Sequence, residues 1–361
     1  MIVRFVCRTL LPAAAVLALA VPAAVPAPGQ LIRHTRGFIE SLAADGPIVA
    51  YDAEGDQPGG PACNRVYAWN LATGRVTRMS GRGTCDADSS STGAGVAELA
   101  VAGKRVAWIT NIGGNSESND RLFAATLPKP RERRLAAVSR FGEVDCVLAG
   151  RTLGGLVGGG AVLAYNLWTT VPGDPSACET KTTSGSLRSI GPRGTTLLRA
   201  GLDTLVAADA DGGRIAVAHA DGTVTLFSSK GAPLQTIGIE PAKNVALSGN
   251  RLVVLTKTRR IQVYNTQTGR AELGRLVPAV AGHLAADGAI AAYAVGASLH
   301  VLRLATGRDT VVATAPKGIV GVAVSTRAVV YAYNVFRRIG KPPRFRDIGT
   351  VVAIPLSRLR G

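Results

Sequence analysis

A short phrase recurs along this chain and constrains its fold more than any single residue does. A hydrophobic stretch, a tight turn containing glycine, and a second hydrophobic stretch ending in Thr-Gly follow one another. The clearest copies span residues 47–74, 251–269 and 289–307, and their second stretches read VYAWNLATG, IQVYNTQTG and HVLRLATG. Such self-similarity is the signature of repeat architectures, in which each unit buries its apolar face against the next. The sequence therefore predicts an all-β array of similar units.

The spacing of the repeats predicts how many units there are. We expect the innermost strand of each unit to start near one of seven positions: Phe38, Val96, Leu148, Asp203, Asn244, Gly282 and Ile319. The last four lie about 40 residues apart, the period of a four-stranded propeller blade, and the wider spacing of the first three predicts insertions. The fold predicted is therefore a seven-bladed β-propeller, with six or eight blades as alternatives.

The two ends of the chain predict how the ring closes. Residues 318–324, 328–334 and 349–355 supply three strands of the last unit, and no fourth strand follows them. Residues 30–36 read as an outer strand without a unit of its own. An N-terminal strand that completes the last blade would remove an exposed sheet edge.

Turn motifs carry a resemblance to known propeller families. The segment Trp69-Asn-Leu-Ala-Thr-Gly is similar to the Trp-Asp-x-x-Thr-Gly segment of WD-repeat blades. The Ala-Asp-Gly turns resemble those of TolB-type propellers, and the Thr-Gly turns resemble those of quinoprotein blades. The resemblance covers residues 31–361 and implies a generic β-propeller without assigning one subfamily.

The N-terminus reads as an export signal. Arg4 and Arg8 form a short basic region, residues 9–30 carry no charge, and Val25-Pro26-Ala27 offers a small-residue cleavage site. We expect a signal peptide over residues 1–27 and one propeller domain over residues 28–361, located in the periplasm, the cell envelope or outside the cell. Several prolines argue against a membrane-spanning helix, and an uncleaved anchor is the alternative.

Cysteine usage agrees with export. After removal of the signal, Cys63, Cys85, Cys146 and Cys178 remain, an even number that favours disulfides in an exported chain. Our strand assignment places both members of the pairs 63–85 and 146–178 on the same side of the ring, so we expect these two pairings. No Cys-x-x-Cys motif indicates a structural zinc site.

The charge of the chain bears on its partners. The formal net charge is +17, and removal of Arg4 and Arg8 with the signal leaves 39 basic against 24 acidic residues, or +15. Such an excess attracts anionic polymers, although a solvated basic surface is the simpler interpretation. We expect a protein, peptide or anionic cell-envelope polymer as partner, and no specific nucleic acid.

Five insertions point to one face of the ring. Residues 53–64, 80–95, 111–120, 169–184 and 336–347 all connect the second strand of a unit to its third, or one unit to the next, so they share one side. Functional residues concentrate on such loops, although neutral loop growth is the alternative. The candidate ligand-binding residues are Arg337, Arg338, Lys341, Arg344, Arg346, Asp86 and Asp88. The basic group among them either binds an anionic ligand or folds onto acidic loops of the same face.

Catalytic motifs are lacking in the sequence. It contains no Gly-x-Ser-x-Gly elbow and no His-Glu-x-x-His helix, so we assign no catalytic residue, cofactor or metal site. Asp86 and Asp88 beside a serine run are the weak cation candidate. The function predicted is an exported, monomeric binding or scaffolding propeller. One alternative is a propeller enzyme, either a metal-dependent hydrolase or lyase or a degenerate quinoprotein, with inner-strand candidates such as Glu98, Asp203 and His283. The other alternative is an electrostatic binder of anionic envelope polymers.

Overall fold

The computed structural model describes residues 29–54, 63–85, 93–113, 117–142, 149–172, 180–192, 194–201, 207–278, 280–339 and 344–359. The proposed signal peptide, residues 1–27, lies outside these ranges. The described part of the chain is built from β-strands and two short 3-10 turns, η1 (Gly83–Cys85) and η2 (Leu356–Arg358). No α-helix occurs within it, as the strand-rich repeat predicts.

Antiparallel meanders of four strands are the building blocks. The first contains β2 (Leu42–Asp45), β3 (Ile48–Glu54), β4 (Asn64–Asn70) and β5 (Val76–Arg78). An eight-stranded sheet follows, with β6 (Gly93–Ala102), β7 (Arg105–Gly113), β8 (Glu117–Thr126), β9 (Arg133–Phe141), β10 (Ala149–Gly159), β11 (Val162–Pro172), β12 (Thr180–Ile190) and β13 (Thr195–Ala200).

Three further four-stranded sheets continue the ring. They are β14 (Ala207–Asp211), β15 (Arg214–Ala218), β16 (Thr223–Ser228) and β17 (Pro233–Gly238); then β18 (Ala242–Ser248), β19 (Arg251–Thr256), β20 (Arg260–Asn265) and β21 (Ala271–Leu276); then β22 (Ala281–Asp287), β23 (Ile290–Val295), β24 (Ser298–Arg303) and β25 (Asp309–Thr314). The last sheet contains β26 (Ile319–Val324), β27 (Ala328–Ile339), β28 (Arg344–Pro355) and, from the other end of the chain, β1 (Leu31–His34).

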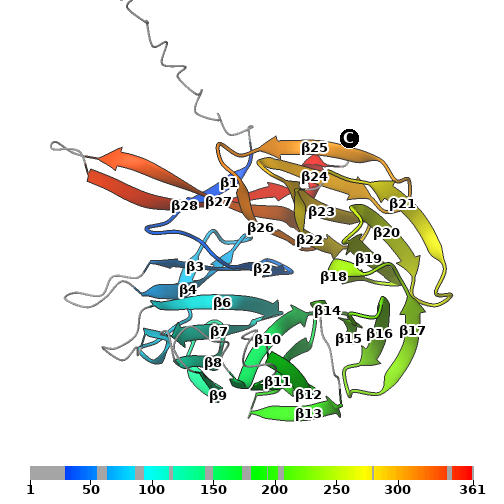
Figure 1. The fold of residues 1–361 in the computed structure, drawn as a ribbon. Helices are drawn as coiled ribbons and strands as arrows, with labels where there is room; N and C mark the ends of the chain where they lie inside the picture. The colour runs from blue at the N-terminus through cyan, green and yellow to red at the C-terminus, as the bar shows by residue number, and fades with distance from the viewer. Residues whose placement is uncertain are drawn as a thin grey trace, which may run out of the picture.

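The innermost strands form a closed circle. Each of β2, β6, β10, β14, β18, β22 and β26 contacts the next in this order, and β26 contacts β2 (Figure 1). The predicted β-propeller fold is therefore confirmed. The eight-stranded sheet consists of two meanders, since β9 and β10 pair only through Phe141 with Ala149 and Arg140 with Gly150. Counting it as two blades gives the predicted seven, and we keep that count as an interpretation.

The ring closes through the N-terminal strand, as predicted. β1 pairs antiparallel with β28, from Leu31 opposite Ala353 to His34 opposite Thr350. The guanidinium of Arg33 lies 5.3 Å from the ring centroid of Trp69 in the first meander, and it donates a hydrogen bond to the Gly74 carbonyl. One short strand thus links the last meander to the first.

Hydrophobic clusters lie between neighbouring meanders rather than within them. Each pair of neighbours shares one cluster of buried side chains, and the cluster between β26–β28 and β2–β4 closes the circle. Between the first two meanders, for example, the Trp108 and Phe123 rings stack with centroids 5.9 Å apart. Both faces of each sheet are therefore covered, which explains the near-continuous apolar runs in the sequence.

Small residues allow the inner strands to approach each other. A Cβ atom on Gly158 would lie 2.4 Å from the Val101 carbonyl oxygen of β6, and one on Gly159 would lie 2.1 Å from the Ala210 carbonyl oxygen of β14. Gly158 and Gly159 are therefore required by packing where three inner strands converge.

Candidate functional site

The predicted insertions lie on one side of the ring, but several of them are strands rather than loops. The second and third strands of a meander are joined on the same side as the links between meanders, and we call this side the hairpin face. β7 and β8 pair as far as Gly113 with Ser118, β11 and β12 as far as Pro172 with Thr180, and β27 and β28 as far as Ile339 with Arg344. Predicting loops there was wrong, because cross-strand pairing extends these segments far beyond the ring core.

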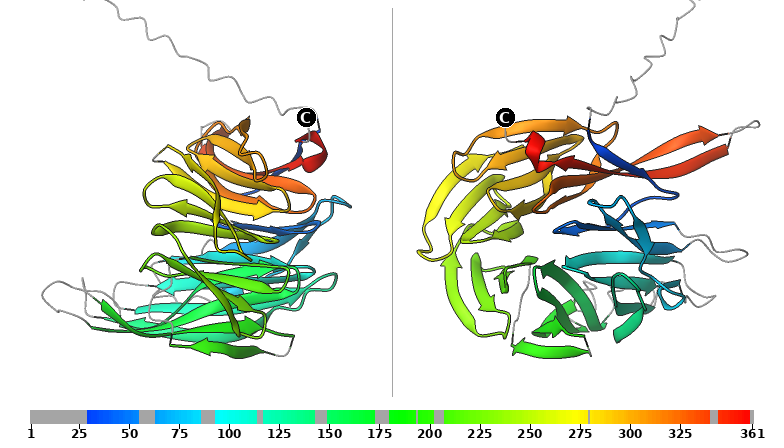
Figure 2. Two further views of the ribbon diagram at one scale, coloured as in Figure 1. Left: turned by 90° about the vertical axis from the view of Figure 1, so that its right-hand side faces the viewer. Right: turned by 180° about the vertical axis from the view of Figure 1, so that it is seen from behind.

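The β27–β28 hairpin is the most prominent of these extensions. It projects beyond the ring in the views from the front and from behind (Figures 1 and 2). Phe336 is 69% exposed, and its ring meets the edge of Phe38 at a centroid distance of 5.1 Å. Arg337 and Arg338 beside it are exposed, and Arg346 is half-buried. The hairpin therefore carries an aromatic and basic surface away from the body of the protein.

Four of the five predicted basic residues lie on the two strands of this hairpin, and one lies outside the described residues. Arg337 and Arg338 lie on β27 and Arg346 lies on β28, where it pairs with Arg337 across the hairpin. Arg344 starts β28, whereas Lys341 lies outside the described residues. Within the described chain, no carboxylate forms an ion pair with Arg337, Arg338 or Arg346. The alternative is that these basic residues fold onto acidic loops of the same face. The described part of the chain shows no such contact.

Two other exposed apolar side chains end strands on the hairpin face. Phe141 at the end of β9 is 59% exposed, and Val171 near the end of β11 is 38% exposed. Large apolar groups on the tips of extended hairpins have no core to join. They add contact area to the same face that carries Phe336.

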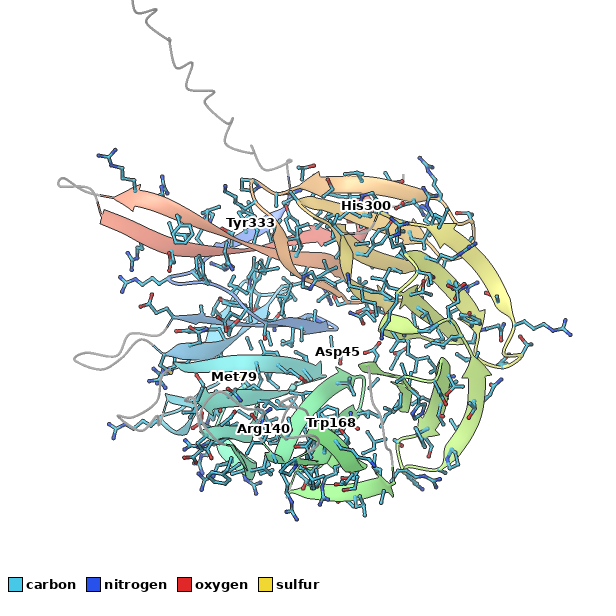
Figure 3. All side chains as sticks on the ribbon, in the orientation of Figure 1. Asp45, Met79, Arg140, Trp168, His300 and Tyr333 are labelled. Atoms are coloured by element: carbon cyan, nitrogen blue, oxygen red, sulfur yellow. The ribbon has the colours of Figure 1, made fainter. Side chains whose placement is uncertain are left out.

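One acidic residue within the predicted insertion of residues 111–120 is structural. Asp120 on β8 is 3% exposed, and its carboxylate accepts hydrogen bonds from Asn111 Nδ2 at 2.6 Å and from the Leu153 backbone N–H at 3.0 Å. Arg140 Nη2 lies 3.7 Å from it. Figure 3 shows Arg140 in this part of the ring. Asp120 therefore fixes the base of the extended β7–β8 hairpin against β10.

The remaining predicted site residues lie largely outside the described chain. Asp86, Asp88, Cys146 and Cys178 lie outside the described residues. Cys63 is buried just before β4, and Cys85 ends η1, so both lie on the hairpin side of the first meander. The pairings 63–85 and 146–178 remain predictions.

A cavity of about 500 Å³ occupies the centre of the ring. Residues of the inner strands line it, and no lysine or arginine occurs among the described lining residues. Four carboxylates line the cavity at the end opposite the hairpin face. At this end, a tight turn connects each inner strand to the second strand of its meander. We call the four carboxylates the acidic ring: Asp45, Asp209, Asp211 and Asp287. Figure 3 shows Asp45 near the centre of the molecule.

Backbone groups of other meanders hold most of the acidic ring. Asp45 Oδ2 accepts hydrogen bonds from the Gly103 and Gly160 N–H groups, at 2.6 and 3.1 Å. Asp209 accepts one from Leu247 N–H at 2.7 Å, and Asp211 accepts one from Gly249 N–H at 2.5 Å. Each of these carboxylates thus bridges to another meander, which gives them a structural role in joining inner strands.

Burial and mutual repulsion shift the protonation of this ring. Burial raises the pKa of Asp209 to about 7 despite the hydrogen bonds from Leu247 and Ala210, and the nearby Asp211 and Asp287 contribute to the increase. Burial likewise raises the pKa of Asp287 to about 6, with added repulsion from Asp211 and Asp45. Two of the four carboxyls therefore change charge near neutral pH. In the described part of the chain, neither these four carboxylates nor any other three His, Cys, Asp or Glu side chains are arranged so that they could hold a metal ion together.

The inner-strand residues considered for catalysis do not converge. Glu98 on β6 accepts hydrogen bonds from Gly155 N–H at 3.2 Å and Leu156 N–H at 2.6 Å, which joins β6 to β10. His283 on β22 has a φ of 52°, and burial lowers the pKa of its imidazole, with Lys243 contributing. Asp203 lies outside the described residues.

Sequence reasoning missed both the acidic ring and a second polar cluster. In the latter, Tyr293 Oη donates to Asp309 at 2.6 Å, and His300 Nδ1 lies 3.3 Å from the same carboxylate. The Tyr293 and His300 rings stack at 4.9 Å (His300 is labelled in Figure 3). These residues face each other on β23, β24 and β25, so the cluster ties one meander together. The only sequence signal for the acidic ring was the repeated Ala-Asp-Gly at the ends of inner strands, which we had interpreted as turns.

Comparison with known proteins shows the fold. Similar solved structures include U3-55K (15% identity, TM-score 0.52, covering 90% of this chain and 98% of that one). A chain of the Mitotic Checkpoint Complex is similar too (14% identity, TM-score 0.51, covering 88% and 93%), as are the WD40 repeats of RRP9 (14% identity, TM-score 0.50, covering 90% and 97%). The chain is a β-propeller. No family model matches it, and no curated protein matches its sequence.

Within the described ranges, the chain has no helix of the length and apolar character needed to cross a bilayer.

Proposed function

We propose that this protein is an exported binding or scaffolding propeller that engages a protein or peptide partner through its hairpin face. The observation that carries the proposal is the β27–β28 hairpin, which projects beyond the ring (Figure 1). The side chains of Phe336, Arg337 and Arg338 on this hairpin are exposed. Exposed aromatic and arginine side chains are the types that dominate the binding energy of protein interfaces. Antiparallel pairing along the whole hairpin presents them in a fixed arrangement, which reduces the entropy lost on binding.

The rest of the hairpin face supports the same role. Phe141 and Val171 add exposed apolar surface at the ends of β9 and β11, and the buried Asp120 network anchors the β7–β8 hairpin. Together these features give several rigid projections on one side of a closed ring. A rigid scaffold with projecting segments is the arrangement on which binding surfaces are commonly built.

Export rests on the sequence of residues 1–27. A basic start, an uncharged apolar stretch and a small-residue cleavage site are the three parts of a secretory signal. N-terminal sequencing of the protein recovered from the cell envelope and the medium tests this part. A mature chain starting near Pro28 supports export, and a full-length chain confined to the cytoplasm contradicts it.

The binding role is tested by removing the hairpin tip. Replacing residues 337–346 with Asn-Gly keeps Phe336 opposite Asp347 and closes the shortened hairpin with a two-residue turn. Immobilised wild-type protein and this variant are incubated with envelope extract, and recovered proteins are compared by quantitative mass spectrometry. The matched control is the double variant Lys230→Glu and Arg308→Glu, which alters exposed charges on the opposite side.

The outcomes separate the proposal from its alternatives. We expect one or more proteins to be recovered by the wild type and the control but lost with the shortened hairpin. Equal recovery by all three would reject the hairpin as the binding element. Recovery that falls with both variants would indicate attraction to the net positive charge alone.

A further inference from the structure

A groove of about 490 Å³ runs between the first two meanders on the side opposite the hairpin face, which we call the turn face. Pro47, Ile48 and Ala68 line it from the first meander, and Leu127 and Pro128 line it from the turn that follows β8. These side chains make the groove largely apolar. The turns of residues 73–75 and 103–104 complete its rim.

Two exposed cations stand at this rim. Arg75 follows the Thr-Gly turn of the first meander, and Lys104 lies in the turn between β6 and β7. Within the described chain, the charged groups of Arg75 and Lys104 have no ion-pair partner. None of the residues that line the groove is acidic. The groove therefore combines an apolar floor with uncompensated positive charge.

A second groove, of about 230 Å³, lies beside the first on the same face. It separates the meander of β6–β9 from that of β10–β13, and Leu135, Leu163 and Ile190 line it. Lys129 and Arg131 stand exposed at its edge. No acidic residue lines this groove either.

The two grooves share one wall. Leu127 and Pro128 face the first groove, and Lys129 and Arg131 face the second, so residues 127–131 form a ridge between them. We call this segment the basic ridge. Both grooves and the ridge thus form one continuous surface that crosses three meanders.

Specific contacts hold the basic ridge in place. At its start, Leu127 N–H donates to the Lys104 carbonyl at 2.9 Å. At its end, the Glu132 carboxylate accepts hydrogen bonds from Gly81 N–H at 2.7 Å and from the Thr84 hydroxyl. The carboxylate that directly follows the ridge in sequence is therefore engaged by groups of the first meander and its following turn. This leaves the positive charge of the ridge exposed on a preformed surface.

The chemistry of the surface selects the occupant. Carboxylates pair well with arginine and lysine, and an apolar groove needs an apolar group to fill it. No aromatic side chain lines either groove, so the surface offers no platform on which nucleobases could stack. An extended peptide that alternates acidic and apolar side chains satisfies both requirements, with apolar groups in the grooves and carboxylates on the rim.

We infer that the turn face over these two grooves is a docking site for an acidic, apolar peptide segment of a partner protein. The site is separate from the hairpin face, so it would give the propeller a second point of attachment. Its apolar contacts come from the groove floors, and its specificity for acidic residues comes from Arg75, Lys104 and the basic ridge.

The test uses a short fluorescein-labelled peptide of alternating leucine and glutamate, and fluorescence anisotropy with the purified, signal-free protein. Three variants are compared with the wild type. Arg75→Glu with Lys104→Glu reverses the rim charge, Thr77→Phe narrows the first groove without changing charge, and Lys230→Glu with Arg308→Glu reverses equal charge elsewhere on the turn face. Circular dichroism melting checks that each variant is folded.

We expect the rim reversal to weaken peptide binding about tenfold or more, because attraction at two positions becomes repulsion. Thr77→Phe should weaken it about threefold or more, since one apolar side chain loses part of its pocket. The control reversal should change affinity less than about twofold. A peptide of alternating leucine and lysine should not bind, because its charges have the same sign as those of the rim.

Three results would overturn the inference. Equal weakening by the rim and control reversals would reduce the effect to net charge. Absence of peptide binding to the folded wild type would remove the site. Rim-dependent binding to anionic phospholipid vesicles or to single-stranded RNA, without binding to the peptide, would assign the surface to a different class of partner.

Discussion

The acidic ring and the β27–β28 hairpin are both charged regions of the molecule, and they hold their charges differently. In the ring, Asp45, Asp209 and Asp211 accept backbone hydrogen bonds from neighbouring meanders. On the hairpin, Arg337 and Arg338 are exposed, and no carboxylate of the described chain pairs with them. Charge in the first region joins inner strands, whereas charge in the second is available to a partner.

This difference separates stability from binding. Changes at the acidic ring and at other buried carboxylates should alter the stability of the fold. Changes at the hairpin tip should alter partner binding with little effect on that stability. Asp120 shows that sequence position alone does not decide whether a charge serves stability or binding. It belongs to the hairpin face, yet it is buried and accepts hydrogen bonds from Asn111 and Leu153. Burial and backbone partners distinguish the two kinds of charge.

The largest effect should come from deleting residues 30–37. The deletion removes β1, exposes the edge of β28 and breaks the contact of Arg33 with Trp69. We expect the melting temperature to fall by about 10 °C or the protein to aggregate, since a free edge strand pairs with other chains. A version lacking only residues 1–27 is the control. An unchanged melting temperature after the longer deletion would contradict ring closure by β1.

The next largest effect should follow Asp120→Ala. Removing this carboxylate takes away the acceptor of the Leu153 N–H in a buried site, and Asn111 Nδ2 keeps only its hydrogen bond to the Ser118 hydroxyl. We expect a loss of about 3 kcal/mol in the free energy of unfolding, measured by urea denaturation. Glu117→Ala on the same hairpin, at an exposed position, should change it by less than about 0.5 kcal/mol. Similar losses for both would mean that Asp120 is not structural.

A smaller, pH-dependent effect should follow Asp209→Asn. The pKa of Asp209 is raised to about 7 in the folded protein, so the folded state binds the proton more tightly than the unfolded state does. Stability therefore falls as the pH rises from about 4 to about 7, and the loss is complete above that range. Asparagine keeps an acceptor for Leu247 N–H without the charge. We expect the variant to be more stable than the wild type by roughly 1–3 kcal/mol at about pH 8 and to show a flatter pH profile.

The control for this prediction is Asp221→Asn, whose effect should have the opposite sign. A hydrogen bond from the Thr223 side chain lowers the pKa of this exposed carboxyl, so its charge stabilises the folded state at neutral pH. The substitution should slightly reduce stability at neutral pH. An Asp209→Asn variant that loses stability at every pH would show that the charged form is the favoured one.

The smallest effect on folding should come from the hairpin arginines. Arg337→Ala with Arg338→Ala removes two exposed charges that have no partner in the described chain. We expect a change in melting temperature of less than about 2 °C, measured by circular dichroism. A large decrease in melting temperature would show that these arginines stabilise the fold. It would remove the contrast between structural charges and charges available to a partner, on which the proposed function rests.

Repeats made the ring predictable, because strand, turn and strand recur within a short stretch of chain. The missing fourth strand of the last unit and the spare strand at residues 30–36 were both local patterns, so closure by β1 could be predicted too. The extended strands were missed because residues 111–120 are rich in glycine, asparagine and serine, and residues 172–176 read Pro-Gly-Asp-Pro-Ser, and all of these residue types favour turns. Pairing across each hairpin outweighs those preferences in the folded protein.

The acidic ring could not be predicted from local sequence. Asp45 and Asp287 are far apart in the chain, and they affect each other only because the ring brings the ends of β2 and β22 to one cavity. The partner of Asp120 is likewise a backbone N–H in the next meander. Contacts of this kind depend on how neighbouring blades pack, which no motif within a blade records.

The central claim is that a partner contacts the projecting hairpin rather than the outer edge of the ring. Site-specific photo-cross-linking tests it most directly, with p-benzoylphenylalanine placed at Phe336 or, as the control, at Leu234 on β17, which is 54% exposed. We predict a discrete cross-linked partner in producing cells from position 336 and none from position 234. Equal cross-linking from both positions, or cross-linking from position 234 alone, would contradict the account.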